Sequence, residues 1–146
     1  MSALSILKDA IKTRLDALVT ATTLKGATTT DLRKNPLDED IQAFPWAFLM
    51  PPATDADVVD NRTVLRTFTF DIMVVEKSEN ITSSTQIENL LEAVLNEFDN
   101  NPTLGGAADG AVLPATSAPQ PIDHMGKNFT VFFVSLKCNR TQSLTY

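Results

Sequence analysis

Residues 64–77 alternate between two sets of side chains so regularly that they predict one long β-strand. One of its faces is apolar in the middle and charged at both ends, so the middle is expected to cover a core. A strand this long is expected to project beyond its sheet and to offer a contact to a neighbouring molecule. The two faces are Arg66, Phe68, Phe70, Ile72, Val74 and Glu76 on one side, and Thr67, Thr69, Asp71, Met73, Val75 and Lys77 on the other.

Two amphipathic helices are predicted, one before and one after that strand. Ser2 is placed to cap the first helix, and Thr85 and Glu88 have capping-box spacing at the start of the second. Apolar residues recur every three or four positions in both segments, so each helix has one face to bury. These positions are Leu4, Leu7, Ile11, Leu15 and Leu18 in the first helix, and Ile87, Leu90, Leu91, Val94, Leu95 and Phe98 in the second.

Shorter strands are predicted on both sides of the long one. Residues 44–50 place their aromatic side chains on one side of a strand, and residues 128–140 are apolar on both faces, which favours a central or sandwiched strand. A Thr-rich stretch at residues 20–30 favours a short edge strand. Within a Gly/Pro-rich segment, residues 111–115 and 120–122 favour two irregular or edge strands.

The remaining segments complete the predicted architecture. Residues 35–40 read as an acidic turn, residues 53–61 as a mobile loop or an extended arm, and residues 141–146 as a C-terminal tail. With 146 residues and 43% apolar content, residues 1–146 are expected to form a single domain. The predicted fold class is α+β, with a mixed or antiparallel sheet of about four to five strands and two main helices packed on one face.

His124 and Cys138 are the single histidine and the single cysteine of the chain, which limits its chemistry. A metal site needs several ligands at set spacing, and no serine or cysteine lies in a nucleophile elbow. Residues 55–60 lack the glycine and glutamate of a calcium loop, and residues 105–110 are better explained as a turn than as a phosphate loop. We therefore expect no enzyme activity, no catalytic residue, no cofactor and no metal, and a small buried thiol at Cys138.

The formal net charge of −6 is spread unevenly along the chain. Residues 31–60 hold seven acids against two bases, whereas residues 127–146 hold three bases and no acid. Segments of opposite sign suit like subunits docking head to tail, although chance clustering on a solvated surface is an equal alternative. Polarity and expected exposure predict contacts at the loop of residues 55–62 and at residues 105–109. The candidate interaction residues are Asp55, Asp57, Asp60, Arg62, Arg66, Lys77, Gly105, Gly106 and Asp109.

No stretch of the sequence predicts contact with a membrane. No apolar run approaches the roughly 20 residues that cross a bilayer, and the N-terminal residues lack a signal-peptide core. We expect a protein that is soluble and intracellular when it is made.

Four segments, in this order, carry a likeness to a known family: residues 5–11 in the first helix, 44–48 in the aromatic strand, 66–72 in the long strand and 129–134 in the last strand. Together with the acidic loop, the second helix and the Gly/Pro segment, this order resembles the tail terminator (tail-completion) proteins of long-tailed bacteriophages. The resemblance implies a homo-oligomeric ring, typically a hexamer, on the head-proximal end of the tail tube. It implies that the ring stops tube polymerisation and provides the head–tail joining surface.

The same resemblance implies the partners and the location of the protein. They are the tail tube protein and the head–tail connector protein, and DNA passes through the channel without specific binding. The protein is expected in the tail or neck of the virion, and in the host cytoplasm during assembly.

Two other functions remain open on the sequence. A head–tail connector or neck adaptor of the virion would also form a ring, but it would bind portal or connector rings instead of tube protein. A small cytoplasmic ligand-binding or enzyme domain would use the Gly/Pro segment as a lid over a pocket, as a monomer or dimer with an activity that depends on His124.

Overall fold

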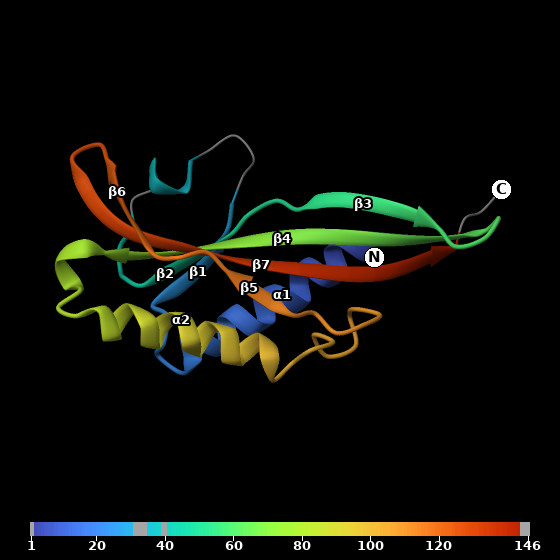
Figure 1. The fold of residues 1–146 in the computed structure, drawn as a ribbon, viewed down its shortest axis with the longest axis horizontal. Helices are drawn as coiled ribbons and strands as arrows, with labels where there is room; N and C mark the ends of the chain where they lie inside the picture. Colours follow the sequence, from blue (N-terminus) through green and yellow to red (C-terminus); the bar gives the residue numbers. More distant parts are fainter. Residues whose placement is uncertain (1, 31–34, 39–40, 144–146) are drawn as a thin grey trace.

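Two long antiparallel strands, β4 (Thr63–Lys77) and β7 (Lys127–Ser143), form the centre of the fold. They pair from Thr63 opposite Ser143 to Lys77 opposite Phe129. The computed structural model describes residues 2–30, 35–38 and 41–143. In Figure 1 the ribbon formed by these two strands runs along the long axis of the molecule.

Shorter strands complete a seven-stranded sheet in the described residues. The order is β1–β2–β4–β7–β5, with β3 on β4 and β6 on β7. The β1–β2 pair is parallel and the others are antiparallel, so the sheet is mixed. The bounds are β1 (Gly26–Thr29), β2 (Trp46–Leu49), β3 (Ala53–Val58), β5 (Pro114–Thr116) and β6 (Gln120–His124). The predicted α+β class is confirmed, whereas the predicted four to five strands are too few.

The strand that the sequence prediction did not count is β3. It pairs with β4 from Ala53 opposite Thr69 to Val58 opposite Val64. Its sequence is poor in β-branched and aromatic residues, so its propensity alone resembles a polar loop. The open edge of β4 supplies the pairing partner, and the mobile-loop alternative is therefore wrong, whereas the extended-arm alternative agrees with the structure.

The C-terminal end of the sheet also differs from the prediction. The last strand continues to Ser143, beyond the predicted end at Arg140, because β4 offers paired backbone groups over that whole length. Residues 144–146 of the predicted tail lie outside the described residues. In the predicted acidic turn the described part forms one short 3-10 turn, Pro36–Asp38, and residues 39–40 lie outside the described residues.

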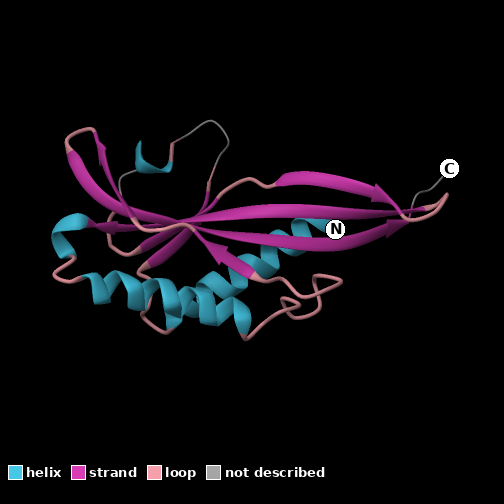
Figure 2. Ribbon diagram, viewed as in Figure 1, coloured by secondary structure: helices cyan, strands magenta, loops and turns pink. Residues whose placement is uncertain are grey.

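Both helices, α1 (Ala3–Thr20) and α2 (Ser84–Asp99), lie on one face of the sheet (Figure 2). As predicted, Ser2 caps α1, and its side chain accepts a hydrogen bond from the Ser5 backbone N–H at 3.1 Å. Its buried face matches the predicted positions except that Leu4 is 37% exposed.

The predicted capping box at the start of α2 is wrong. Ser83 is the N-cap residue and α2 begins at Ser84, so Thr85 already lies inside the helix. Gln86 reaches back instead, and its Oε1 accepts a hydrogen bond from the Thr82 backbone N–H at 3.1 Å. The Ser83–Gln86 spacing is the one that a capping box uses, although the Ser83 side chain makes no cap bond.

Apolar clusters lie on both faces of the sheet, because successive residues of a strand point to opposite faces. The larger cluster fills the space between the sheet and the two helices and includes Ile72, Val74, Phe132 and Val134. The smaller one lies on the other face near one end of the long strands. Its buried residues are Phe48, Met73, Val75, Phe129 and Val131.

Gly26 lies under the ring of Trp46, its partner in the β1–β2 pair. A Cβ atom at Gly26 would lie 2.2, 2.3 and 2.5 Å from three ring atoms. The ring cannot move freely, because its Nε1 donates a hydrogen bond to Thr28 Oγ1 at 2.9 Å. We expect Gly26→Ala to lower the free energy of unfolding by about 1–3 kcal/mol and to shift the fluorescence of Trp46, the single tryptophan.

Urea denaturation and the emission spectrum of the folded protein check this expectation. Gly110→Ala is the matched control, because no atom lies within 4 Å of the place its Cβ would occupy. Equal effects of the two substitutions would contradict the packing of Trp46 on Gly26.

Candidate functional site

Three strands extend past the N-terminal end of α1, as Figure 1 shows. We call this part the arm: it consists of β3, the turn at residues 59–62, residues 63–69 of β4 and residues 137–143 of β7. Every residue of β3 is exposed. Among the described residues β3 pairs only with β4, so its other edge presents backbone groups to a partner strand.

The hydrogen-bond pattern of the β3–β4 pair identifies the backbone groups on that open edge. The Val59 N–H donates to the Thr63 carbonyl at 3.0 Å, and in an antiparallel pair such bonded positions recur every second residue. The bonded residues of β3 are therefore the odd-numbered ones, and Thr54, Ala56 and Val58 direct their backbone groups outward. The Ala56 N–H donates to Asp55 Oδ1 at 2.8 Å.

The tip of the arm combines apolar and charged side chains. Val58 is 79% exposed and Val59 61% exposed, next to the turn that contains Asp60 and Arg62. A hydrogen bond from the Arg62 backbone N–H to Asp60 Oδ1 at 2.8 Å lowers the pKa of this carboxyl below its ordinary value. The tip therefore presents exposed aliphatic surface beside an ionised acid, which suits contact with a protein partner.

The candidate residues of β3 and β4 lie on the two faces of the arm. Asp55 and Asp57 pair with odd-numbered residues of β4 and lie on the face away from the helices. Arg66 lies on the helix-facing side, directly opposite Arg140 of β7. Its Nε donates to Gln142 Oε1 at 3.2 Å, and an Arg140 Nη1 donates to the Ala107 carbonyl at 2.6 Å.

Gly105, Gly106 and Asp109 lie in the segment between α2 and β5, which packs against the arm. Both glycines have positive φ, 70° and 91°, a conformation that other residues rarely adopt. The Asp109 backbone N–H donates to the Asn139 carbonyl at 2.9 Å, and its carboxylate accepts a hydrogen bond from the Thr141 backbone N–H. The bond from Thr141 lowers the pKa of Asp109, so this residue attaches the segment to the arm as an anion.

Lys77 does not join the other candidate residues. It lies at the opposite end of β4 from the arm, where its Nζ forms an ion pair with Glu79 Oε1 at 2.7 Å. The sequence analysis missed Thr54 of β3 and Arg140 of β7. Ala56, Val58 and Val59 lie within residues 55–62, which it expected to make contacts. A valine pair, Val58 and Val59, within a polar segment was the available sequence signal.

The only histidine of the chain lies away from the arm, in β6. His124 Nε2 contacts Asp38 Oδ1, so the β6–β7 hairpin is attached to the 3-10 turn on the other side of the sheet from the helices. Within residues 2–30, 35–38 and 41–143, no group of three or more His, Cys, Asp or Glu residues is arranged to hold a metal ion. No helix in the described part of the chain is long and apolar enough to cross a membrane.

The arm is the part of the structure that gathers most of the candidate residues, on an exposed strand edge and an aliphatic tip. Such an arrangement favours binding to another protein chain, through backbone hydrogen bonds and buried aliphatic area. In comparisons with known proteins, no protein-family model matches this sequence, and no curated protein matches it.

Proposed function

We propose that this protein is a tail terminator of a long-tailed bacteriophage. It forms a ring on the head-proximal end of the tail tube, stops tube polymerisation and provides the head–tail joining surface. The observation that carries the proposal is the arm, a three-stranded extension with an open edge and an aliphatic tip. The order of helices and strands, which resembles that family, agrees with it.

A ring of identical subunits needs two different surfaces on each copy, one complementary to the other. The first surface in this proposal is the helix-facing side of the arm, where Arg66 and Arg140 lie directly opposite each other. The two arginines repel each other because like charges on directly opposite residues are destabilising. An acidic surface of a neighbouring copy would offset this repulsion. The second surface is the exposed side of α2, which carries Glu88, Glu92 and Asp99.

Besides these two charged surfaces, the open edge of β3 also contributes to the contact between copies. Backbone groups of Thr54 and Val58 and the carbonyl of Ala56 face outward there, and a strand from the neighbouring copy adds to them, since the Ala56 N–H already donates to Asp55 Oδ1. The exposed side chains of Val58 and Val59 are then buried at the centre of the contact. DNA passes through the ring without specific binding, because an acidic protein does not neutralise phosphates.

We expect Val58→Asp to raise the protein concentration needed for ring formation by about tenfold or more. Val58 is 79% exposed in the single chain, so its substitution leaves the fold intact but places an uncompensated charge in the contact. Light scattering and negative-stain imaging of the purified protein measure ring formation. Leu113→Asp is the matched control, since Leu113 is 71% exposed and lies outside the arm.

The function itself is tested by adding tail tube protein. Wild-type protein is expected to cap the tubes and to limit their length in negative-stain images, and Val58→Asp is expected to do so only at higher concentration. A protein that stays monomeric with tube protein present would overturn the proposal. Binding to portal or connector rings instead of tubes would identify it as a neck adaptor.

A further inference from the structure

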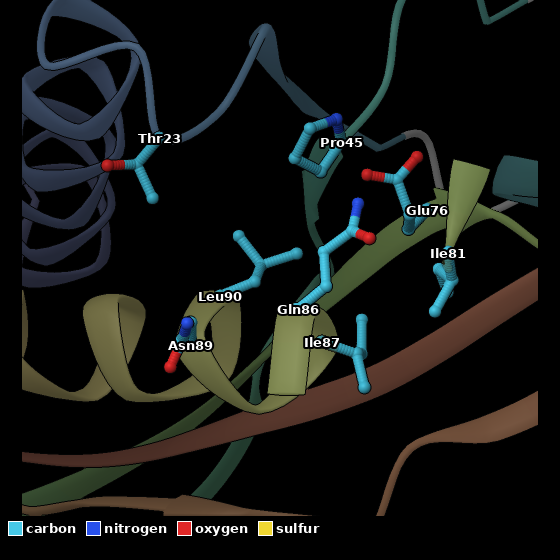
Figure 3. A pocket seen from close by; sticks show the side chains of 8 residues that line it. All are labelled: Thr23, Pro45, Glu76, Ile81, Gln86, Ile87, Asn89 and Leu90. Carbon is cyan, nitrogen blue, oxygen red and sulfur yellow. The ribbon is translucent and has the colours of Figure 1, made fainter. Parts of the chain in front are cut away.

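A pocket of about 290 Å³, which Figure 3 shows from close by, contains Glu76. It therefore lies near the end of β4 that is away from the arm tip. Its walls come from the turn after α1, the residue before β2, the end of β4 and residues 81–90, which include the first turns of α2. Pro45, Ile81, Ile87 and Leu90 provide apolar surface, and Glu76 provides a carboxylate. In Figure 3 that carboxylate is directed toward Pro45 and the side-chain amide of Gln86.

Glu76 is 7% exposed, which is unusual for a charged side chain. Its Oε1 accepts hydrogen bonds from the Lys77 backbone N–H at 2.9 Å and from Asn80 Nδ2 at 3.2 Å, so both bonds go to the same oxygen. None of the ion pairs among the described residues includes Glu76, and the adjacent Lys77 pairs with Glu79. A buried carboxylate without a cation is costly, and a ligand that brings one offsets that cost.

We propose that this pocket binds a cationic group at the end of a short aliphatic chain, either a primary ammonium or a guanidinium. The apolar walls contact the methylene groups and Glu76 forms a charge-assisted hydrogen bond with the head group. The volume is at the lower end of the roughly 300–1,000 Å³ of small-molecule sites, which suits a group the size of a lysine or arginine side chain. Anionic ligands are excluded by the carboxylate.

Two sources supply this chemistry, a free alkyl cation or a basic side chain of a second copy of this chain. Arg62 is the exposed basic residue at the tip of the arm. It precedes the first residue of β4, whereas Glu76 lies near the last, so the two are separated by about 45 Å within one copy. Arg62 therefore reaches a Glu76 pocket only in another copy. The inference does not depend on the proposed function, because a free alkyl cation reaches the pocket of a monomer and a second copy need not belong to a tail ring.

Agmatine, which carries a guanidinium and an ammonium on a four-carbon chain, is the probe for the free-cation source. Titration calorimetry on the full chain is expected to show binding that weakens at least about tenfold in Glu76→Gln, which keeps the accepting oxygen and removes the charge. Glu79→Gln is the matched control, since Glu79 is a neighbouring acid outside the pocket. Leu90→Phe fills the pocket, leaves the carboxylate in place and is expected to weaken binding as well.

Sedimentation of wild type, Glu76→Gln and Arg62→Gln identifies the source. Weaker self-association of both variants, together with competition by agmatine, supports the side chain of a second copy. Agmatine binding that needs Glu76, with self-association unchanged, supports a free cation. The inference is overturned when agmatine does not bind wild type and Glu76→Gln leaves self-association unchanged, or when Glu79→Gln weakens binding as much as Glu76→Gln. If Glu76→Gln does not fold, agmatine binding that Leu90→Phe leaves unchanged overturns it.

Discussion

Replacing Phe132 by alanine is expected to lower the free energy of unfolding by about 3–5 kcal/mol. Phe132 is 0% exposed and packs in the cluster between the sheet and both helices, opposite Val74 of β4. Removal of the ring leaves a cavity. The surrounding helices and strands fill it only in part, because their other contacts hold them in place. Because the free energy of unfolding of a domain is typically only about 5–15 kcal/mol, this single substitution removes a large share of the stability of the protein. Urea denaturation followed by Trp46 fluorescence measures it.

The matched control for this prediction is the next residue of the same strand. Phe133 lies on the opposite face, opposite Met73, and is 38% exposed. We expect Phe133→Ala to cost about 1 kcal/mol or less, since its ring has less contact to lose. Losses of similar size at the two positions would show that the faces of β7 are assigned wrongly.

These two phenylalanines also show how far periodicity predicts the fold. The sequence of β7 is apolar on both faces, and a central or sandwiched strand was expected. In the structure β7 is central, but on the face away from the helices the smaller apolar cluster covers only the part of β7 that contains Phe129 and Val131. How much of this face is buried depends on residues far away in the sequence, such as Phe48. The pattern of β7 alone therefore does not determine it.

Elements with a strong period were predicted well, and the short strands β1, β5 and β6 were also expected, but the strand β3 was not. The alternation of β4 placed Phe70 and Ile72 on the core face, where they are fully buried. The pairing of β3 comes from the open edge of β4, so propensity gave no signal for it. The capping prediction at Thr85 was wrong because several Ser and Thr residues precede α2 and each can begin a helix.

The candidate surface was predictable in part for the same reason. Polarity identified Asp55, Asp57, Asp60 and Arg62, which the structure brings together on the arm. The contact of Asp109 with Thr141 joins residues 32 positions apart, and no local pattern predicts it. The pocket at Glu76 has walls from four separate segments, so sequence reasoning could identify the charged end of the strand but not the cavity beside it.

Cys138 is expected to react with a disulfide reagent at least about 10³-fold more slowly in the folded protein than in the unfolded chain at pH 8. Burial raises the pKa of its thiol from 9.0 to about 12, and the thiolate is the reactive form. Three pKa units lower the thiolate fraction by about 10³, and the side chain is 0% exposed. Because Cys138 lies opposite Phe68 at the base of the arm, its reaction also reports opening of these strands.

The same shift predicts how stability depends on pH. The unfolded thiol loses its proton near pH 9 and the folded thiol near pH 12, so between these values the unfolded state binds fewer protons. The contribution of this thiol to the free energy of unfolding is therefore fully present below pH 9. It falls by about 1.4 kcal/mol per pH unit as the pH rises from 9 toward 12. Cys138→Ala is the control, because alanine loses packing but does not titrate. The stability advantage of wild type over Cys138→Ala is expected to shrink from pH 9 to pH 11, and a constant difference would contradict a buried, neutral thiol.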